Sequence, residues 1–348
     1  MRINSVTYAK AIAIILMVLA HARIFQYGQY WINMFHMPLF FMMSGYCFKY
    51  SYLDDVKGFI AKRFSGIYVP FVKWSILFLL LHNFFFHLNI YSDEFGFRGQ
   101  VSELYTLKDI IIKAFSLVFA LGNSEQLLGG YWFLRELFLG SIIFYVTVLF
   151  TSKRPYIGGG ILLIVNIALL AVGSQTNFYG ARTVLAALFI WVGFIVRNQG
   201  FILYRNSWFP VLGFSLVTLG AFLWQASCLS VSLITYIPFV VTAIFGSLSV
   251  FYLCEAMDGS ADNIGKRVLR FIGENTLTIL TWHFLSFKLI SLIIIWLNDL
   301  PIKRLNEFPV IEEYAQGGWW VVYSIVGIFL PLLLAWLNKY IPSRYLKL

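Results

Sequence analysis

The sequence predicts an all-α, polytopic membrane protein with about ten transmembrane helices, and three observations support this. Hydrophobic residues make up 60% of the chain and charged residues only 12%, about half the share usual in a soluble domain. The hydrophobic residues form runs close to the length of about 20 that crosses a bilayer as a helix. The charged residues gather in the short segments between these runs. We therefore expect a single transmembrane domain over residues 1–348, because no connecting segment is long enough to fold alone.

In chain order, ten apolar segments are expected to span the membrane. They are residues 6–23, 31–48, 67–87, 131–150, 156–174, 182–197, 208–225, 233–254, 273–296 and 318–341. Pro38 is expected to loosen the helix of the second segment, since proline lacks a backbone N–H. The stretch 107–119 has charges on one side and apolar residues around the rest, which predicts a helix at the outer interface.

The distribution of lysine and arginine predicts the orientation, because cytoplasmic loops carry an excess of both. With the N-terminus inside, the cytoplasmic segments, among them 49–66 and 255–272, hold most of these residues. An even number of spans then places both termini in the cytoplasm. The formal net charge of +10 is scattered over short loops, which favours contact with anionic membrane lipids and argues against a nucleic-acid partner.

Two histidines and a lysine lie inside the first two apolar segments, where ionisable groups are costly and mark a functional site by default. Lys10 and His21 share one helix face, since their spacing makes three turns plus about 20°. Their axial separation of roughly 16 Å puts Lys10 near the inner surface and His21 in the outer half. On the second segment, His36 is expected only about 7 Å below the outer surface.

Further polar residues are predicted near these three. The fourth span begins with Trp132, Arg135 and Glu136, so the last two can share an outer layer with His21 and His36 if the helices pack together. His283 in the ninth span is either part of the site or a helix–helix hydrogen bond. His82 and His87 at the outer end of the third span are interpreted as interfacial histidines.

Lys62, Arg63 and Lys73, at the entry to the third span, form a basic cluster with Lys10 on the expected inner side. This cluster has two interpretations. It can anchor the protein by the positive-inside rule, or it can clamp a polyphosphate group. A neutral buried histidine on the outer side suits proton abstraction from a hydroxyl. Together, an inner clamp and an outer base suggest a reaction between a cytoplasmic donor and an outer acceptor.

Other chemistries have little support in the sequence. It contains no glycine-rich phosphate loop, no nucleophile motif of soluble enzymes and no zinc-ligand spacing, so neither a metal nor a bound cofactor is expected. Cys47, Cys228 and Cys254 have neither metal nor disulfide spacing and are interpreted as small apolar residues.

The chain resembles the acyltransferase 3 superfamily over nearly its whole length. Two motifs carry most of the resemblance: Lys10 followed by His21 in the first helix, and Phe35-His36-Met37-Pro38-Leu39-Phe40-Phe41 continuing to Ser44-Gly45-Tyr46 in the second. Weaker similarities are Lys62-Arg63-Phe64 with Pro70-Phe71, Gly130-Tyr131-Trp132-Phe133-Leu134, and the late helix with Gly273, Asn275, Thr276 and His283. The superfamily includes fucose 4-O-acetylase-like proteins and enzymes that O-acetylate bacterial surface polysaccharides.

The resemblance implies a ten-helix enzyme of the inner (plasma) membrane that moves an acyl group, usually acetyl, from cytoplasmic acyl-CoA to a sugar hydroxyl outside. His21 would be the essential histidine, either as a base or as a transient acyl carrier. Lys10 would act beside it, in the donor pocket or by holding the first helix in place. The chain has no appended hydrolase-like periplasmic domain, and if it is the whole enzyme, it is expected to complete transfer to the acceptor itself.

One position departs from the family pattern. Many members have two arginines three residues apart at the third-helix entry, whereas here Arg63 is followed by Gly66. Lys62 or Lys73 can substitute in charge, but lysine lacks the forked geometry of arginine. The donor site is therefore less well defined by the sequence than the histidines.

Two other functions are compatible with parts of the pattern. A transporter or flippase for a lipid-linked sugar would also use intramembrane charges and a proline-broken helix. However, the sequence has no inverted repeat, and a transporter does not need the combination of Lys10, His21 and the second-helix motif. A membrane sensor or scaffold would use the polar residues only to join helices.

Overall fold

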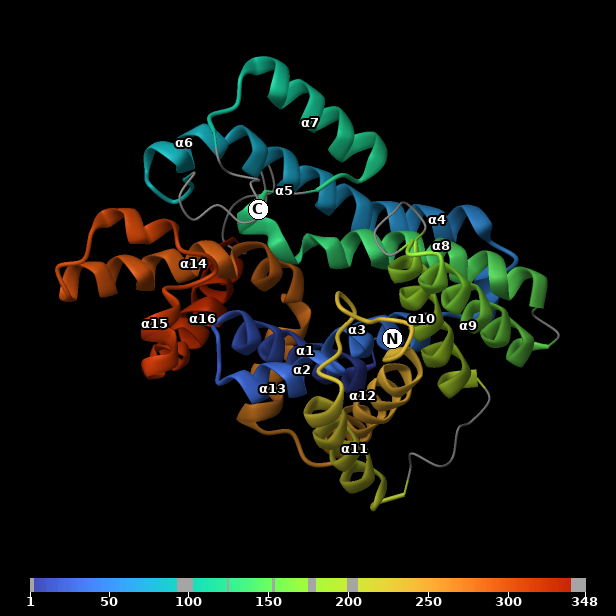
Figure 1. Cartoon of the computed structure of the whole chain (residues 1–348). Helices are drawn as coiled ribbons and strands as arrows, with labels where there is room; N and C mark the ends of the chain where they lie inside the picture. The colour runs from blue at the N-terminus through green and yellow to red at the C-terminus, as the bar shows by residue number, and fades with distance from the viewer. Residues whose placement is uncertain are drawn as a thin grey trace. The chain divides into compact units, whose positions relative to one another are not determined.

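The computed structural model describes residues 3–92, 103–123, 125–151, 154–174, 180–198 and 206–338, and these residues are helical with no β-strand (Figure 1). This confirms the predicted all-α class. The N-terminal helices are α1 (Asn4–His21), α2 (Gln26–Asn33), α3 (His36–Tyr46), α4 (Val56–Arg63), α5 (Val69–Leu80), α6 (His82–His87) and α7 (Leu107–Ala120). The later helices are α8 (Trp132–Thr151), α9 (Pro155–Ala171), α10 (Ala181–Asn198), α11 (Phe209–Leu223), α12 (Tyr236–Asp258), α13 (Ile264–Glu274), α14 (Thr276–Leu297), α15 (Glu312–Tyr314) and α16 (Trp320–Asn338).

Within the described ranges, seven helical stretches are long and apolar enough to cross a membrane. They are Asn4–His21, Val56–Leu80, Gln126–Thr151, Ala181–Asn198, Tyr236–Asp258, Thr276–Leu297 and Glu312–Leu337. The apolar helices α9 and α11 are shorter. These stretches establish a multi-pass membrane protein. The count of ten spans and the cytoplasmic termini stay predictions, and residues 1–2 and 339–348 lie outside the described part.

Two short helical segments differ in winding from the α-helices that they adjoin. Residues Phe64–Tyr68 (η2) are π-helical and join α4 to α5, and residues Gln126–Tyr131 (η4) form a 3₁₀ turn that leads into α8. The π-helical segment follows Arg63 directly, at the point where the sequence predicts a donor clamp. Single π-helical turns inside longer helices often lie at functional sites.

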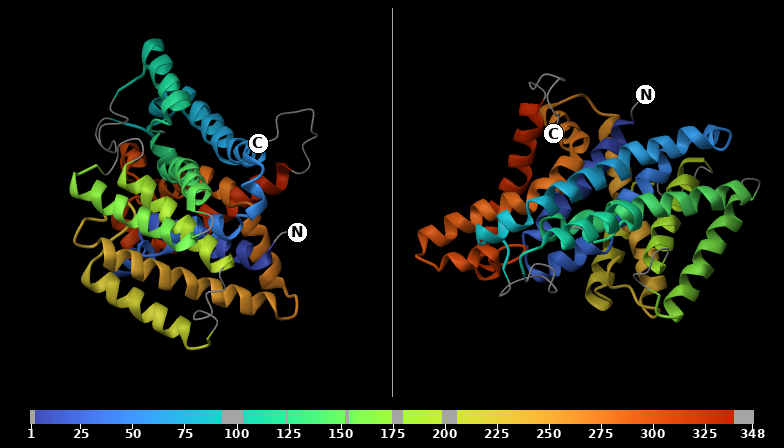
Figure 2. Two further views of the ribbon diagram at one scale, coloured as in Figure 1. Left: turned by 90° about the vertical axis from the view of Figure 1, so that its right-hand side faces the viewer. Right: turned by 90° about the horizontal axis from the view of Figure 1, so that it is seen from above.

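The chain folds into two compact units, each built from separate stretches of sequence. The first unit comprises Met1–Leu16, Tyr27–Val69 and Phe133–Glu274, and the second comprises Met17–Gln26, Pro70–Trp132 and Asn275–Leu348. Figure 2 shows the course of the chain from two further sides. The prediction of one transmembrane domain stays a prediction.

Glycines let the helices of the first unit approach closely. An added Cβ on Gly45 of α3 would lie 1.7 Å from the Ile190 carbonyl oxygen of α10, and one on Gly193 of α10 would lie 1.8 Å from the Met42 carbonyl oxygen of α3. Small residues at such crossings allow backbones to touch, as in other membrane helix pairs. The α3–α10 pair therefore has a fixed rotation, and this decides which side chains gather at its ends.

The expected second span is broken, and the break precedes the proline. Helix α2 ends at Asn33 and α3 starts at His36, whereas Pro38 lies in the first turn of α3. Proline is tolerated in a first turn because the N–H it lacks has no partner within the helix there. The Ser247 hydroxyl donates to the Phe35 carbonyl oxygen at 3.3 Å, which helps to satisfy the broken backbone.

Helix α7, in the second unit, confirms the helix expected at residues 107–119. Thr106 caps its N-terminus, and the Asp109 side chain accepts from the Thr106 backbone N–H in a capping box. These hydrogen bonds lower the pKa of Asp109. Large apolar side chains on α7 remain exposed, among them Leu107, Ile111, Phe115 and Phe119. This pattern suits a helix that lies against lipid.

Candidate functional site

The candidate site is a pair of histidines in the second unit. His21 is the last residue of α1 and His283 lies in the second turn of α14. The two rings stack at 13°, and His21 Nδ1 is 3.0 Å from His283 Nε2. His283 is fully buried, whereas His21 is half-buried. His283 thus makes a hydrogen bond between helices, and its partner is the histidine that the sequence ranks first. Its part in the site stays a prediction.

The hydrogen bonds around the pair determine where its protons lie. His283 Nδ1 contacts the carbonyl oxygens of Ile279 at 3.0 Å and Leu280 at 3.1 Å. A carbonyl oxygen only accepts, so Nδ1 of His283 carries the proton and Nε2 of the neutral ring accepts. His21 Nδ1 must then donate to it. A neutral His21 therefore has its lone pair on Nε2, the nitrogen that a base or an acyl carrier uses.

Aromatic rings hold the pair in place. Phe284 stacks on His21 with ring centroids 4.8 Å apart, and its centroid lies 4.0 Å from that of His283. Phe287 meets His283 edge to face at 5.6 Å. On α16, Gly327 leaves room for this ring, since an added Cβ would lie 2.4 Å from Phe287. Such packing restricts the orientation of both imidazoles and lowers the local dielectric.

The segment before α8 packs against the same helix. The hydroxyls of Tyr131 and Thr281 are 2.7 Å apart, and both residues are buried. An added Cβ on Gly130 would meet Leu280 at 2.7 Å, and one on Gly129 would lie 3.5 Å from Phe284. The glycines that precede Trp132 therefore bring backbone close to the ring that stacks on His21. In the sequence, this stretch stands out only by its resemblance to the family, and its contact with α14 was not predicted.

A buried lysine attaches the loop that follows α14 to this helix. Lys288 Nζ donates to the carbonyl oxygens of Leu305 at 3.0 Å and Glu307 at 2.7 Å. The next residue in this loop, Phe308, contacts the Phe284 ring with centroids 4.7 Å apart. Lys288 thus fixes a loop that packs on the ring beside His21. The sequence did not identify Lys288, although an intramembrane lysine is itself a signal.

Replacing Lys288 by methionine is expected to destabilise this loop. The variant keeps the length of the side chain but leaves two carbonyl groups without this donor, at a cost of about 1–3 kcal/mol. The midpoint of thermal unfolding, followed by intrinsic fluorescence of the purified protein, should fall. Lys303→Met removes an exposed lysine of the same loop and is the control. Equal midpoints for both variants would contradict this role.

His36 is placed in the first unit and makes a local contact. It is 5% exposed, and its Nδ1 donates to the Ile32 carbonyl oxygen at 2.8 Å. This bond bridges the break between α2 and α3, so His36 has a clear structural role. Its catalytic role stays a prediction.

Arg135 and Glu136 also lie in the first unit, on α8. The Thr183 hydroxyl donates to Glu136 Oε2 at 2.5 Å, and Arg135 Nε is 3.9 Å from Glu136 Oε1. Glu136 is buried, and its bond to Thr183 joins α8 to α10. The second unit holds Trp132 and Asn275, which start α8 and precede α14, respectively. Their proposed support of the acceptor stays a prediction.

The residues of the predicted inner clamp are divided between the units. In the first unit, Arg63 donates to the Ser44 hydroxyl at 3.1 Å, and Lys62 donates to the Tyr52 hydroxyl at 2.9 Å. Lys73 belongs to the second unit and lies over the Trp74 ring at 4.8 Å. A side chain at Gly66 would have no heavy atom within 4 Å. Arg63 is thus the clamp residue with a hydroxyl of the α3 motif as its neighbour.

His82 is buried and His87 is exposed, and their interfacial position stays a prediction for both. His82 Nδ1 is 2.7 Å from Glu125 Oε2, and its Nε2 donates to the Glu103 carbonyl oxygen at 3.0 Å. The Tyr105 ring stacks on His82 at 3.4 Å, and burial together with the Glu125 carboxylate raises the pKa of Tyr105. These contacts attach the segments before and after α7 to α6.

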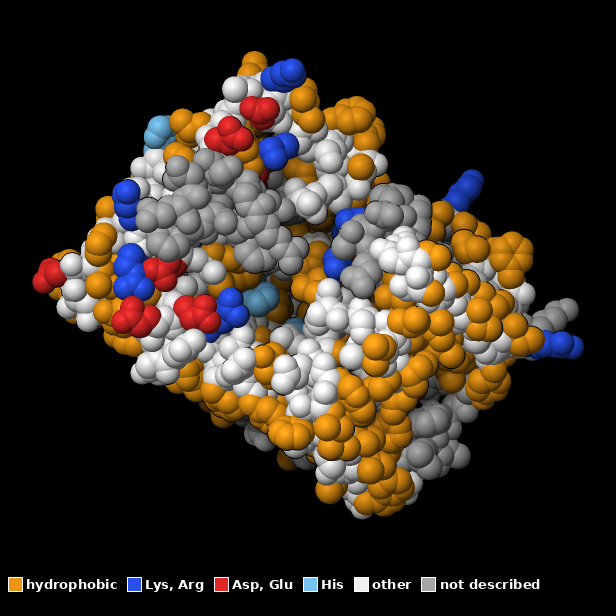
Figure 3. All heavy atoms as spheres, in the orientation of Figure 1, with side chains coloured by type: hydrophobic (Ala, Val, Ile, Leu, Met, Phe, Trp, Pro, Cys, Tyr) orange, Lys and Arg blue, Asp and Glu red, His pale blue; other side chains and the backbone are white. Residues whose placement is uncertain are grey.

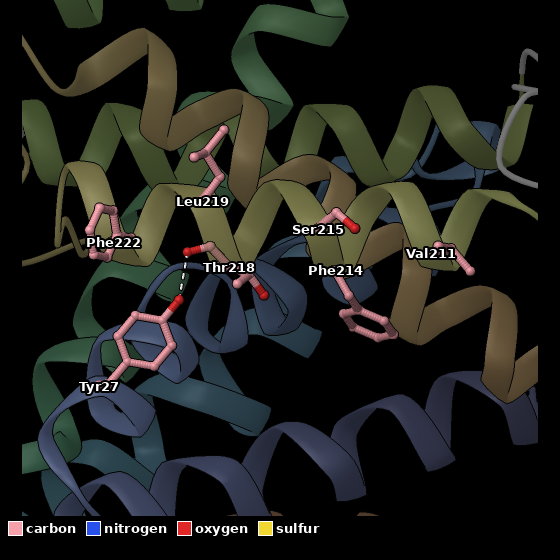
Figure 4. A pocket seen from close by; sticks show the side chains of 7 residues that line it. All are labelled: Tyr27, Val211, Phe214, Ser215, Thr218, Leu219 and Phe222. Atoms are coloured by element: carbon pink, nitrogen blue, oxygen red, sulfur yellow. Dashed lines mark hydrogen bonds between the residues drawn. The ribbon is translucent and has the colours of Figure 1, made fainter.

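A hollow on the first unit has a different character. It measures about 610 Å³ and is lined by Tyr27 and by residues of α11: Val211, Phe214, Ser215, Thr218, Leu219 and Phe222 (Figure 4). The Tyr27 hydroxyl donates to the Thr218 carbonyl oxygen at 2.7 Å. The lining offers no base and no cation for acyl transfer. Hydrophobic side chains cover much of the face seen in Figure 3, as expected for a surface in lipid.

Comparison with known proteins identifies one family. The acyltransferase 3 family model, described as an acyltransferase domain, matches residues 3–340. No curated protein and no solved structure matches the chain. Among the described residues, no three His, Cys, Asp or Glu side chains gather as metal ligands.

Proposed function

Because the chain belongs to the acyltransferase 3 family and is a multi-pass membrane acyltransferase, we propose that it transfers an acetyl or other acyl group from cytoplasmic acyl-CoA to a hydroxyl of an extracytoplasmic or lipid-linked sugar. The observation that carries this proposal is the hydrogen bond between His21 and His283. It supports a lone pair on His21 Nε2, the group that O-acyl transfer requires. The protein acts in this proposal at the inner (plasma) membrane, with membrane lipids as its surroundings.

The proposed reaction has His21 as its general base. His21 Nε2 removes the proton of the acceptor hydroxyl, and the oxygen attacks the thioester carbonyl carbon of the donor. The C–S bond breaks, the new C–O bond forms the ester, and coenzyme A leaves as a thiolate that takes up a proton. His283 accepts from His21 Nδ1 throughout, so positive charge that develops on His21 is shared with a fixed partner. A neutral base on a buried helix end suits this step.

In this proposal, the acyl-CoA donor binds on the cytoplasmic side of the membrane. Lys10 lies on the same helix as His21, roughly 16 Å away along the axis. Arg63 is joined to Ser44 of the α3 motif. A guanidinium binds phosphate oxygens through two N–H donors at once, so Arg63 suits the phosphates of coenzyme A.

The decisive test is a comparison of surface glycans from cells with and without the protein. Loss of an O-acetyl group, detected by nuclear magnetic resonance before and after mild alkali, is the expected result. The purified protein in nanodiscs should also transfer label from acetyl-CoA to the glycan that lost the group. Identical glycans in both cells, together with no transfer by the purified protein, would contradict the proposal.

Replacing Arg63 by alanine is expected to affect the donor more than the acceptor. Loss of a charge-assisted hydrogen bond costs about 1.5–3 kcal/mol, so the KM for acyl-CoA should rise about tenfold or more. The KM for the acceptor should change little. Initial rates of the purified variant at several concentrations of each substrate separate the two. An unchanged dependence on acyl-CoA would show that the donor phosphates bind elsewhere.

A further inference from the structure

Three cations of the first unit converge at the C-terminal end of α3. Lys10 of α1, Arg63 of α4 and Arg197 of α10 all lie close enough to Cys47 to act electrostatically on its sulfur. Arg63 also bonds to Ser44 at 3.1 Å, and the Arg197 guanidinium lies 5.0 Å from the centroid of the Tyr46 ring. In the sequence, Arg197 is the last residue of the expected span 182–197. The structure brings it from a distant helix to the α3 motif.

The packing of α10 on α3 places Arg197 there. Gly45 and Gly193 let the two backbones touch, so α10 cannot rotate freely against α3. Arg197 lies four residues after Gly193, one turn further along α10. Its position beside Tyr46 is therefore set by backbone contacts, which are stiffer than side-chain contacts.

Charged groups of both signs lie at this cluster. The Tyr46 hydroxyl donates to Glu255 Oε1 at 3.5 Å, so one carboxylate reaches the same tyrosine as Arg197. Lys10, Arg63 and Arg197 are all cations, so an anion with several negative charges would complement them.

The geometry of Arg197 suits an anion that arrives from solvent. The residue is exposed, in contrast to the half-buried Arg63. Its contact with the Tyr46 ring is a cation–π contact, which does not use the N–H donors of the guanidinium. Arg197 can thus hold its side chain in a fixed place and still offer its fork of N–H groups.

We infer that Arg197 binds the phosphate groups of the acyl-CoA donor together with Arg63, and thereby selects donors that carry these phosphates. This inference rests on the proposed function, in which acyl-CoA is the donor. It adds a specificity-determining residue from α10 to the clamp that the sequence placed at the third-helix entry alone.

The test compares Arg197→Gln with the unaltered full-length protein in nanodiscs. Binding of coenzyme A, measured by isothermal titration calorimetry without acceptor, should weaken about tenfold or more. The KM for acetyl-CoA should rise by a similar factor, while the KM for S-acetylpantetheine, which lacks the phosphates, should change less than about twofold. Arg267→Gln removes an exposed arginine that pairs with Asp262 at 3.2 Å and is the matched control.

The outcomes are distinguishable. Unchanged binding of coenzyme A by Arg197→Gln, in a protein that binds it before substitution, overturns this inference and leaves the proposed function standing. An equal rise of the KM for acetyl-CoA and for S-acetylpantetheine overturns it as well, because Arg197 would then not recognise the phosphates. Failure of the unaltered protein to bind coenzyme A overturns both the inference and the proposed function. Arg197→Lys, with one charge but no fork, should recover only part of the affinity.

Discussion

Replacement of His21 by glutamine or alanine is expected to abolish acyl transfer. General base catalysis contributes about 10²–10⁴-fold to a rate, so turnover should fall by about 10³-fold or more. Glutamine is the more informative change, because its amide group can still donate to His283 Nε2 and keep α1 attached to α14. A variant that is folded but inactive would assign the loss to the missing lone pair on Nε2.

Transfer of label from acetyl-CoA to the acceptor by protein in nanodiscs measures this effect. Size-exclusion profiles and thermal unfolding establish that the variants are folded and inserted. His87→Ala is the control, since His87 is exposed at the end of α6. Acetylation of the glycan at the unaltered level by His21→Gln would remove His21 from the reaction.

Replacement of His283 by leucine is expected to lower turnover almost as much as replacement of His21. The leucine fills much of the same volume but cannot accept from His21 Nδ1, so the His21 ring loses its fixed tautomer. In a serine protease, the loss of the tautomer-fixing partner of the catalytic histidine costs about 10⁴-fold. We expect about 10²–10³-fold here, because the partner is a neutral ring and carries no charge.

His283→Gln tests whether loss of the hydrogen bond to His21 causes the lower turnover of His283→Leu. The amide oxygen of glutamine can accept from His21 Nδ1, so this variant should recover part of the turnover that leucine loses, while the KM for acetyl-CoA stays unchanged in both. Ser286→Ala, one turn further along α14, removes a hydroxyl that donates to Trp282 within the helix and is the control. The double change of His21 and His283 should be no worse than His21→Ala alone, since both act through one lone pair. Equal activities of the Leu and Gln variants, or additive losses, would contradict the positioning role.

The fold class was predictable because it depends on local properties of the chain. A run of apolar residues long enough to cross a bilayer satisfies its backbone within the helix, whatever its neighbours are. Six of the seven long apolar helices and α7 therefore lie close to the predicted ranges, whereas Val56–Leu80 begins well before the expected span 67–87. The break in the second span was expected at Pro38, but it lies at Met34 and Phe35 instead. The local bond of His36 to Ile32 and the tertiary bond of Ser247 to Phe35 hold the backbone there.

The partners of the site residues were less predictable. Helix periodicity put Lys10 and His21 on one face, but it does not say which helix that face meets. His283 was expected about 15 Å into the ninth span, and sequence reasoning linked His21 with His36, Arg135 and Glu136. The structure gives His21 a hydrogen bond to His283 instead. A spacing within one helix is a local quantity, whereas a hydrogen bond between helices depends on how both are rotated.

By itself, the sequence of this protein determined that it is a helical membrane protein. It also determined that several ionisable residues lie inside apolar segments, and which of these are candidates for the functional site. Those conclusions follow from hydrocarbon length and from the cost of a charge in lipid, and both are properties of single segments. Only the tertiary structure decided that His283 sets the tautomer of His21 and that Arg197 joins Arg63 at the end of α3. The physical reason is that close approach of glycine-bearing helices fixes their rotation, and rotation selects which polar groups meet.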